Sequence, residues 1–132
     1  MIRRIQVRTR GRDDWVDITR EVEETVRDPE APAEGVATVF VPHTTAGVTI
    51  QENADPPLRG DISKALDRIF PWGADWSHCE DNAAAHMKAA VVGSSVQVVF
   101  AGGKLLLGTW QDIFLCEFDG PRAREVIIKL SP

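Results

Sequence analysis

The sequence predicts one α+β domain over residues 1–132, with a largely antiparallel, sandwich-like β-sheet and two main helices. The length matches one hydrophobic core, since domains commonly contain about 100–150 residues. Short apolar stretches rich in β-branched residues lie at both ends of the chain, which is typical of strands. Two longer segments in the middle carry helix start and stop residues, and helices set apart from strands favour the α+β class.

The N-terminal segment alternates apolar and charged residues. This alternation predicts a first strand that begins at Ile2, and Trp15–Ile18 predicts a second. A short helix follows over residues 19–30, where apolar residues four apart share one face and Pro29 ends the helix.

The central segment begins with two predicted strands, Val36–Val41 and Val48–Ile50. They are expected to pair as neighbours because only the short turn-like segment HTTAG separates them. Asp55 followed by two prolines predicts a helix start, and this helix is expected to run to about Phe70. Its expected buried stripe is Leu58, Ile62, Leu66 and Ile69.

The C-terminal half is predicted to contain a second main helix and then four strands. The alanine-rich stretch Glu80–Val92 predicts the helix, which Gly93 closes. Gly102-Gly103 predicts a hairpin turn, since both residues tolerate positive φ. The expected strands are Ser95–Ala101, Lys104–Gly108, Asp112–Phe118 and Ala123–Leu130.

Composition and charge narrow the class of partner. The net charge of −5 argues against nucleic acid as the main partner, because binding its phosphate backbone requires a basic surface. No apolar run suggests a membrane span or a signal peptide, so a cytoplasmic protein is expected. Cys79 and Cys116 are then expected to be free thiols.

The three histidines mark the candidate site. His78, Asn82 and His86 are spaced four apart, which places them along one face of a helix. His43 follows an apolar strand, where functional side chains often emerge. The alternatives are a hydrogen-bonded surface histidine at position 43 and a solvated helix face. We expect all three imidazoles to share one site and to bind a divalent metal ion, zinc first among them.

Two further polar segments are candidates for acid–base chemistry or substrate binding. Glu52 or Asp55 is a candidate acid–base group, although for Asp55 plain helix capping is favoured. Asp61 faces either the site or solvent. The segment from Gly108 to Gln111 offers a hydroxyl, an amide and the ring of Trp110, a set that suits a heteroaromatic ligand. The alternative for Trp110 is a place in the core or in a subunit interface.

Three long motifs carry a family resemblance: FVPHTTAGVTIQENADP, HCEDNAAAHMKAAVVGSS and GGKLLLGTWQDIFLCEFDGPRAREV. With them the chain resembles the YjbQ family, also known as secondary thiamine-phosphate synthases. The resemblance implies an α+β sandwich-like fold, a homotrimer with a polar pocket at or near subunit contacts, and formation of thiamine phosphate from a pyrimidine diphosphate and a thiazole phosphate. The family pattern falls on His43, Thr44, Asn53, Asp55, Asp61, His78, Asn82, His86, Lys88, Gly108, Trp110 and Gln111.

Two hypotheses follow. In the first, the protein is an enzyme acting on a phosphorylated small molecule, with a metal ion or cation neutralising the leaving phosphates and an aromatic side chain holding the ring. The roles are then metal binding by His43, His78 and His86, phosphate binding by Lys88 or Arg59, stacking by Trp110, and orientation by Asn53, Asn82 and Gln111. A metal-dependent hydrolase, with Glu52 or Asp55 activating water, is a variant. The second hypothesis is a non-catalytic trimer that binds a metal ion or a small ligand.

Overall fold

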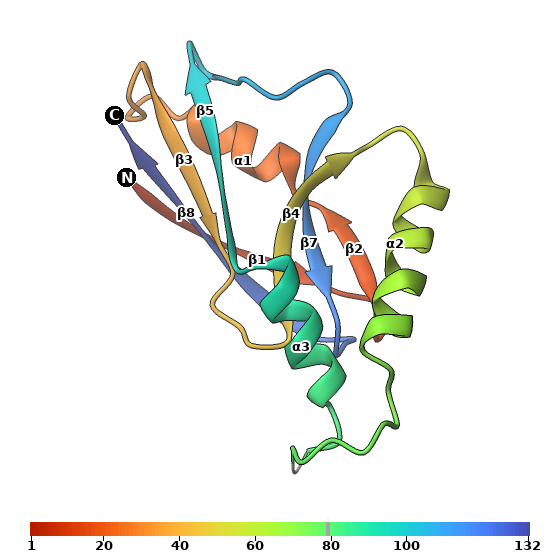
Figure 1. The fold of residues 1–132 in the computed structure, drawn as a ribbon. Helices are drawn as coiled ribbons and strands as arrows, with labels where there is room; N and C mark the ends of the chain where they lie inside the picture. The colour runs from red at the N-terminus through yellow and green to blue at the C-terminus, as the bar shows by residue number, and fades with distance from the viewer. Residues whose placement is uncertain (79) are drawn as a thin grey trace.

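The structure, a computed structural model, describes residues 1–78 and 80–132 and contains eight strands and three helices (Figure 1). The strands are β1 Ile2–Arg8, β2 Asp14–Asp17, β3 Glu34–Phe40, β4 Ala46–Glu52, β5 Ser95–Ala101, β6 Lys104–Leu105, β7 Gln111–Glu117 and β8 Ala123–Ser131. The helices are α1 Thr19–Val26, α2 Pro56–Ile69 and α3 Ala83–Val92. The predicted α+β class is confirmed.

The strands form two antiparallel sheets. The larger sheet has the order β1-β8-β3-β5-β6, and the smaller has the order β2-β7-β4. One apolar cluster joins them, with Val39 and Ile128 of the larger sheet packed with Leu115 of the smaller. The other face of β7 presents Phe114 to a second cluster that includes residues of α2 and α3. Since successive side chains of a strand point to opposite faces, β7 is buried on both sides.

The expected pairing of the two central strands is wrong. β3 lies between β5 and β8 in the larger sheet, whereas β4 pairs with β7 in the smaller. Both edges of β3 are therefore occupied, and residues 41–45 carry the chain across from one sheet to the other. This crossing segment contains His43, and it exists because the two strands do not form a hairpin.

The main helices differ in detail from those expected. α3 begins at Ala83 rather than Glu80, because Asp81 has a φ of 57°, outside the range of a right-handed helix. In α2 the expected stripe is only partly buried: Leu66 is buried, but Ile69 is 63% exposed. The strand expected at 104–108 is limited to Lys104–Leu105. No helix within the described residues combines the length and the apolar character needed to cross a membrane.

The C-terminal end of α3 rests directly on β4. The amide of Val48 donates a hydrogen bond to the carbonyl of Gly93 at 3.0 Å. A Cβ at Gly47 would lie only 2.6 Å from the same carbonyl oxygen, so only glycine allows this approach. The contact places α3 beside the crossing segment and brings His86 and His43 to the walls of the same pocket.

Candidate functional site

Two residues of β8 hold the crossing segment in place through hydrogen bonds. The side chain of Arg124 donates hydrogen bonds to the hydroxyl of Thr45 at 2.8 Å and to its carbonyl at 3.3 Å. One residue further along β8, the amide of Glu125 donates to Nε2 of His43 at 2.9 Å. The position and orientation of the His43 ring are therefore set by two successive residues of β8.

Arg124 is itself fixed by a buried ion pair with Glu117, whose side chain is fully enclosed. Thr9 also donates to this carboxylate, at 2.8 Å. Burial alone would raise the pKa of Glu117, but the hydrogen bonds from Arg124 and Thr9 outweigh it and hold the pKa below its usual value. Glu117 is therefore charged at neutral pH, and the guanidinium of Arg124 stays anchored at the pocket wall.

The opposite wall comes from the N-terminal end of α3. Asn82 is buried, and its Nδ2 donates to the carboxylate of Asp119 at 2.8 Å, which fixes the orientation of the amide. Its Oδ1 and the Nε2 of His86 are both buried, and neither has a hydrogen-bond partner among the described residues. Because unpartnered buried polar atoms are costly, both atoms are open to a further hydrogen bond or to an ion contact.

His78 lies next to His86, although not on the same helix. The two ring centroids are 4.7 Å apart and the rings are inclined by 69°. His78 precedes α3, so the expected spacing along one helix face does not bring these rings together. The contact arises instead from the loop that leads into the helix.

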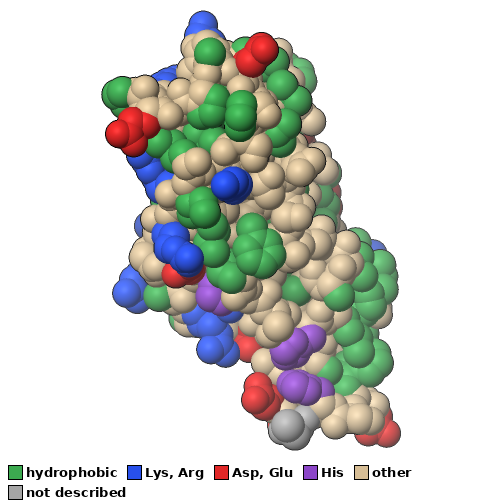
Figure 2. All heavy atoms as spheres, turned by 90° about the vertical axis from the view of Figure 1, so that its left-hand side faces the viewer, with side chains coloured by type: hydrophobic (Ala, Val, Ile, Leu, Met, Phe, Trp, Pro, Cys, Tyr) green, Lys and Arg blue, Asp and Glu red, His purple; other side chains and the backbone are tan. Residues whose placement is uncertain are grey.

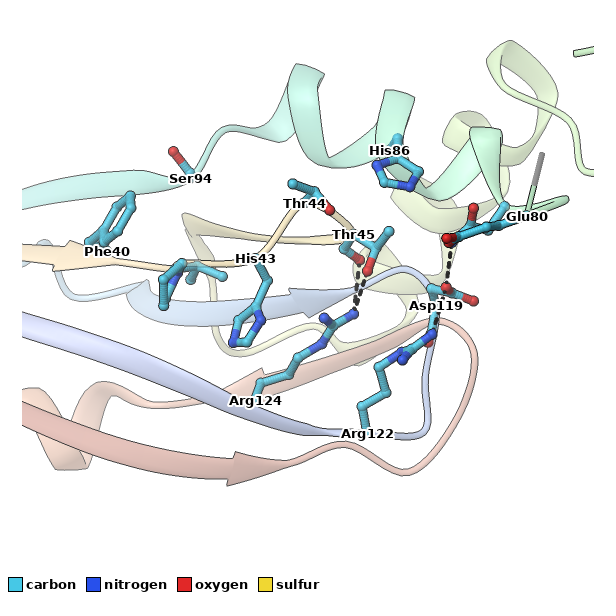
Figure 3. A pocket seen from close by; sticks show the side chains of 13 residues that line it. Phe40, His43, Thr44, Thr45, Glu80, His86, Ser94, Asp119, Arg122 and Arg124 are labelled. Atoms are coloured by element: carbon cyan, nitrogen blue, oxygen red, sulfur yellow. Dashed lines mark hydrogen bonds and ion pairs between the residues drawn. The ribbon is translucent and has the colours of Figure 1, made fainter. Parts of the chain in front are cut away.

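Between the two walls lies a pocket of about 570 Å³ (Figure 3). His43 and Arg124 approach it from one side and His86 from the other. An adjoining cavity of about 370 Å³ shares His43, Thr44 and His86 and extends over alanines of α3. The polar side chains that line the main pocket are His43, Thr44, Thr45, Glu80, Asn82, His86, Ser94, Asp119, Arg122 and Arg124. Figure 2 shows this side of the molecule, with histidines and with Lys and Arg side chains gathered close by.

The structure brings together only part of the predicted site. His43, Thr44, Asn82 and His86 line the main pocket, and His78 contacts His86. The metal, substrate and catalytic roles given to these five residues remain predictions. Asp55 and Asp61 are exposed and do not line this pocket, and Asp55 makes no capping hydrogen bond through its side chain.

A second polar group lies at the other end of β4. Glu52 pairs with Gln111, and Asn53 donates its side-chain amide to Asp112 at 3.0 Å. Trp110 is 61% exposed there, and the side chain of Gln111 accepts a hydrogen bond from the amide of Gly108 at 2.9 Å. Since β4 begins beside the His43 segment and advances by about 3.3 Å a residue, these two ends lie roughly 20 Å apart. This distance separates the second group from the histidines of its own chain.

Asp112 in this second group has an unusual environment. Burial raises its pKa to about 6, and the neighbouring carboxylate of Asp17, within hydrogen-bond reach, contributes to the increase. The pKa of Asp17 is lowered: burial works against this, but hydrogen bonds from Asp112 and Thr19 outweigh it. The two carboxyl groups therefore share a proton over the pH range in which Asp112 titrates.

Lys88 does not stand where a phosphate-binding residue is needed. Its ammonium group is almost completely buried, and it pairs with Asp67 and, at 3.3 Å, with Asp13. The ring of Trp72 also faces it, at 5.9 Å. The expectation of a phosphate contact is therefore corrected: Lys88 connects α3 with α2 and with the turn before β2.

Sequence reasoning missed the charged residues that follow β7. Asp119, Arg122 and Arg124 line the pocket, and Arg122 donates to Asp119 at 3.0 Å. These residues belong to the segment DGPRAR, which lies within the third motif of the family resemblance. It could not be assigned to the site without knowing that the start of β8 lies under His43.

Of the two cysteines, the structure describes Cys116. Cys116 is a free thiol in the interior, where burial raises its pKa and keeps it protonated. Cys79 lies outside the described residues.

The residues that line the pocket decide whether it can hold the metal ion that the sequence predicts. Within residues 1–78 and 80–132, no three His, Cys, Asp or Glu side chains lie close enough together to form a metal site. The unpartnered Nε2 of His86 and Oδ1 of Asn82 nevertheless suit a cation, because each can offer a lone pair. The ring of His78 lies beside that of His86, so His86, Asn82 and His78 are the residues that would hold such an ion.

Comparisons with known proteins give the family. The family described as "UPF0047 protein YjbQ-like" matches residues 3–132. The UPF0047 protein YugU of Bacillus subtilis is 47% identical, with 98% of each chain covered. A crystal structure of a YjbQ/UPF0047 protein from Clostridium acetobutylicum matches with a TM-score of 0.93 at 48% identity, covering 97% of this chain and 98% of that one. A protein of unknown function from Sulfolobus solfataricus matches with the same TM-score at 34% identity, covering 98% and 95%. The chain therefore belongs to the YjbQ, or UPF0047, family.

Proposed function

We propose that the protein is a small-molecule enzyme whose substrate carries a phosphate or diphosphate group and binds in the pocket between β8 and α3. The observation that carries the proposal is the lining of this pocket, which combines the guanidinium groups of Arg122 and Arg124 with the unpartnered Nε2 of His86 and Oδ1 of Asn82. Guanidinium groups bind phosphate oxygens through charge-assisted hydrogen bonds, and they stay protonated at any physiological pH.

The arrangement supports transfer chemistry with a phosphate leaving group. In the reaction implied by the family resemblance, the thiazole nitrogen attacks the methylene carbon of the pyrimidine diphosphate, and the carbon–oxygen bond to diphosphate breaks. Negative charge then builds on the departing oxygen. Arg122, whose side chain is half exposed, would neutralise that charge, and the hydroxyl of Thr44 would donate to the same group.

A divalent metal ion, zinc first among the candidates, is part of this proposal. His86 and Asn82 would hold it, with His78 as a further ligand. When bound, such an ion supplies additional positive charge toward a phosphate group or a leaving oxygen.

We further propose that the protein acts as a homotrimer, as the family resemblance implies. Large apolar side chains remain uncovered in the single chain: Trp110 is 61% exposed, Leu106 60% and Val99 56%. Contiguous exposed apolar surface commonly marks a subunit contact. An assembly would also give Trp110 a role, because it lies far from the pocket of its own chain.

The test is a turnover assay with purified protein, the two phosphorylated precursors and each of several divalent metals. Formation of thiamine phosphate that depends on His86 and Arg122 supports the proposal. Equal turnover in His86→Ala, Arg122→Ala and the unchanged protein contradicts it, because the product would then arise outside this pocket.

A further inference from the structure

We propose that His43 is a neutral imidazole that donates its Nδ1–H to the anionic group of the bound ligand, and that it is not a metal ligand. The inference rests on the proposed function in one respect, namely that the ligand is anionic. It alters the expected metal site, since it assigns His43 to the opposite wall of the pocket.

The hydrogen bond from the main chain defines the form of the ring. The amide of Glu125 lies 2.9 Å from Nε2 of His43 and has only a proton to offer. Nε2 must therefore supply the lone pair and carry no proton. A neutral imidazole has one N–H, so that proton is on Nδ1. The same lone pair is then no longer free for a metal ion.

The amide of Glu125 bonds to His43 because the pairing of β3 with β8 ends nearby. β3 pairs with β8 only as far as Phe40, opposite Ile127. Beyond that point the chain leaves the sheet, and the amide of Glu125 loses the strand partner it would otherwise have. His43 takes the place of that partner. A purely structural role for His43 would need only this contact at Nε2.

The other nitrogen is free to act in the pocket. Nδ1 makes no hydrogen bond to any described residue, and the ring lines both the main pocket and the adjoining cavity. Burial, and next to it the positive charge of Arg124, lower the pKa of His43, and they outweigh the backbone hydrogen bond at Glu125 and the carboxylates of Glu117 and Glu125, which raise it. Figure 3 shows the ring beside the Arg124 side chain, on the opposite side from His86.

The two walls therefore differ in hydrogen-bonding character. Arg122 and the Nδ1–H of His43 are donors, which suits an anion. The Oδ1 of Asn82 is an acceptor and the Nε2 of His86 can be one, which suits a cation. A metal ion bound on the α3 wall would leave His43 with the ligand's negative group.

The first experiment measures the tautomer directly. We would record the ring-nitrogen NMR spectrum of protein labelled with ¹⁵N-histidine and assign His43 by the signals lost in His43→Asn. We expect a protonated Nδ1 and a bare Nε2, both unchanged when zinc is added. A proton on Nε2, or His43 signals that move with zinc while those of His86 do not, would overturn the inference.

The second experiment tests whether His43 is a hydrogen-bond donor or a metal ligand. It uses calorimetric titration with inorganic pyrophosphate and, independently, with zinc. His43→Ala should weaken pyrophosphate binding by about 10-fold or more, the usual effect of losing one hydrogen bond to a charged group. His43→Asn should restore most of it, because its amide N–H replaces Nδ1–H, whereas His43→Gln should not. Zinc affinity should stay the same in all three variants, and thermal unfolding checks that each is folded.

The outcomes distinguish the inference from the proposed function. If the unchanged protein does not bind pyrophosphate, the proposed function and the donor role fail together. If pyrophosphate binds but His43→Asn is as weak as His43→Ala, only the donor role fails. If zinc affinity falls in the His43 variants as it does in His86→Ala, His43 is a metal ligand and the inference is wrong.

Discussion

Arg124 binds the carboxylate of Glu117 and, with the same guanidinium, the hydroxyl and carbonyl of Thr45. This one side chain therefore links the end of β7 to the crossing segment that carries His43. The pair is enclosed, so its energetic role differs from that of an exposed ion pair: removal of one member leaves an uncompensated charge in the interior.

Glu117→Gln should consequently destabilise the fold by about 3–5 kcal/mol, the range for breaking a buried pair. The matched control is Glu24→Gln, which removes the exposed pair with Arg20 and should cost less than about 1 kcal/mol. Urea unfolding followed by tryptophan fluorescence measures both. Similar midpoints for the two variants would mean that the buried pair contributes no more than a surface one.

The Asp17–Asp112 pair predicts a pH dependence of stability. A group whose pKa is raised on folding contributes stability that is fully present below its unfolded pKa and is lost as the pH rises through the folded value. For Asp112 this loss spans the interval between the ordinary pKa of 3.8 and the folded value of about 6. Asp112→Asn keeps the acceptor for Asn53 and removes the titration.

We therefore expect the unchanged protein to lose stability between about pH 4 and pH 6 relative to Asp112→Asn, measured as the difference in thermal midpoint at each pH. A constant difference across that range would contradict the raised pKa. Glu117 acts in the opposite direction: its pKa is lowered, so its contribution is present above the unfolded pKa and is lost as the pH falls through the folded value.

Sequence reasoning identified the pocket histidines, because a strand end and an alanine-rich helix are local features. It failed where residues far apart in the sequence lie close together in the fold, and where residues expected to lie together are kept apart. Arg124 could not be placed beside His43 without the β3–β8 ladder, which pairs residues between 87 and 95 positions apart. Trp110 and Asn53 were grouped with the histidines because both segments are polar, whereas the length of β4 keeps them apart. Lys88 lies on the right helix, but on a face that meets Asp13 and Asp67.

Metal binding should depend on His86 and Asn82, at the N-terminal end of α3. Protein freed of metal and then incubated with zinc should retain about one ion per chain, removable by a chelator or by acid that protonates the histidines. His86→Ala should lose most of it, since this substitution removes the unpartnered Nε2. Elemental analysis of the desalted protein gives the ratio. Full retention by His86→Ala would exclude this end of α3 as the metal site.

The proposed trimer predicts a mass of about three times the 14.6 kDa chain in sedimentation equilibrium. Trp110→Glu should lower that mass, because it places a charge on an exposed apolar side chain. Arg20→Glu, on the exposed face of α1, is the control and should leave the mass unchanged. A single-chain mass for the unchanged protein at micromolar concentration would refute the assembly.

The chemistry gives the last prediction. Thiamine phosphate should form slowly from the two phosphorylated precursors, and the rate should fall by about 100-fold in His86→Ala, the usual effect of removing a group that stabilises developing charge. Arg122→Ala should act on the same step, because the arginine faces the leaving phosphates. Trp110→Ala should instead raise KM with little change in kcat, since a lost stacking surface weakens ground and transition states alike. Steady-state kinetics on the three variants separate these effects. A kcat loss confined to Trp110→Ala would contradict this prediction. It would indicate that the reaction takes place at the second polar group and not in the pocket of the histidines.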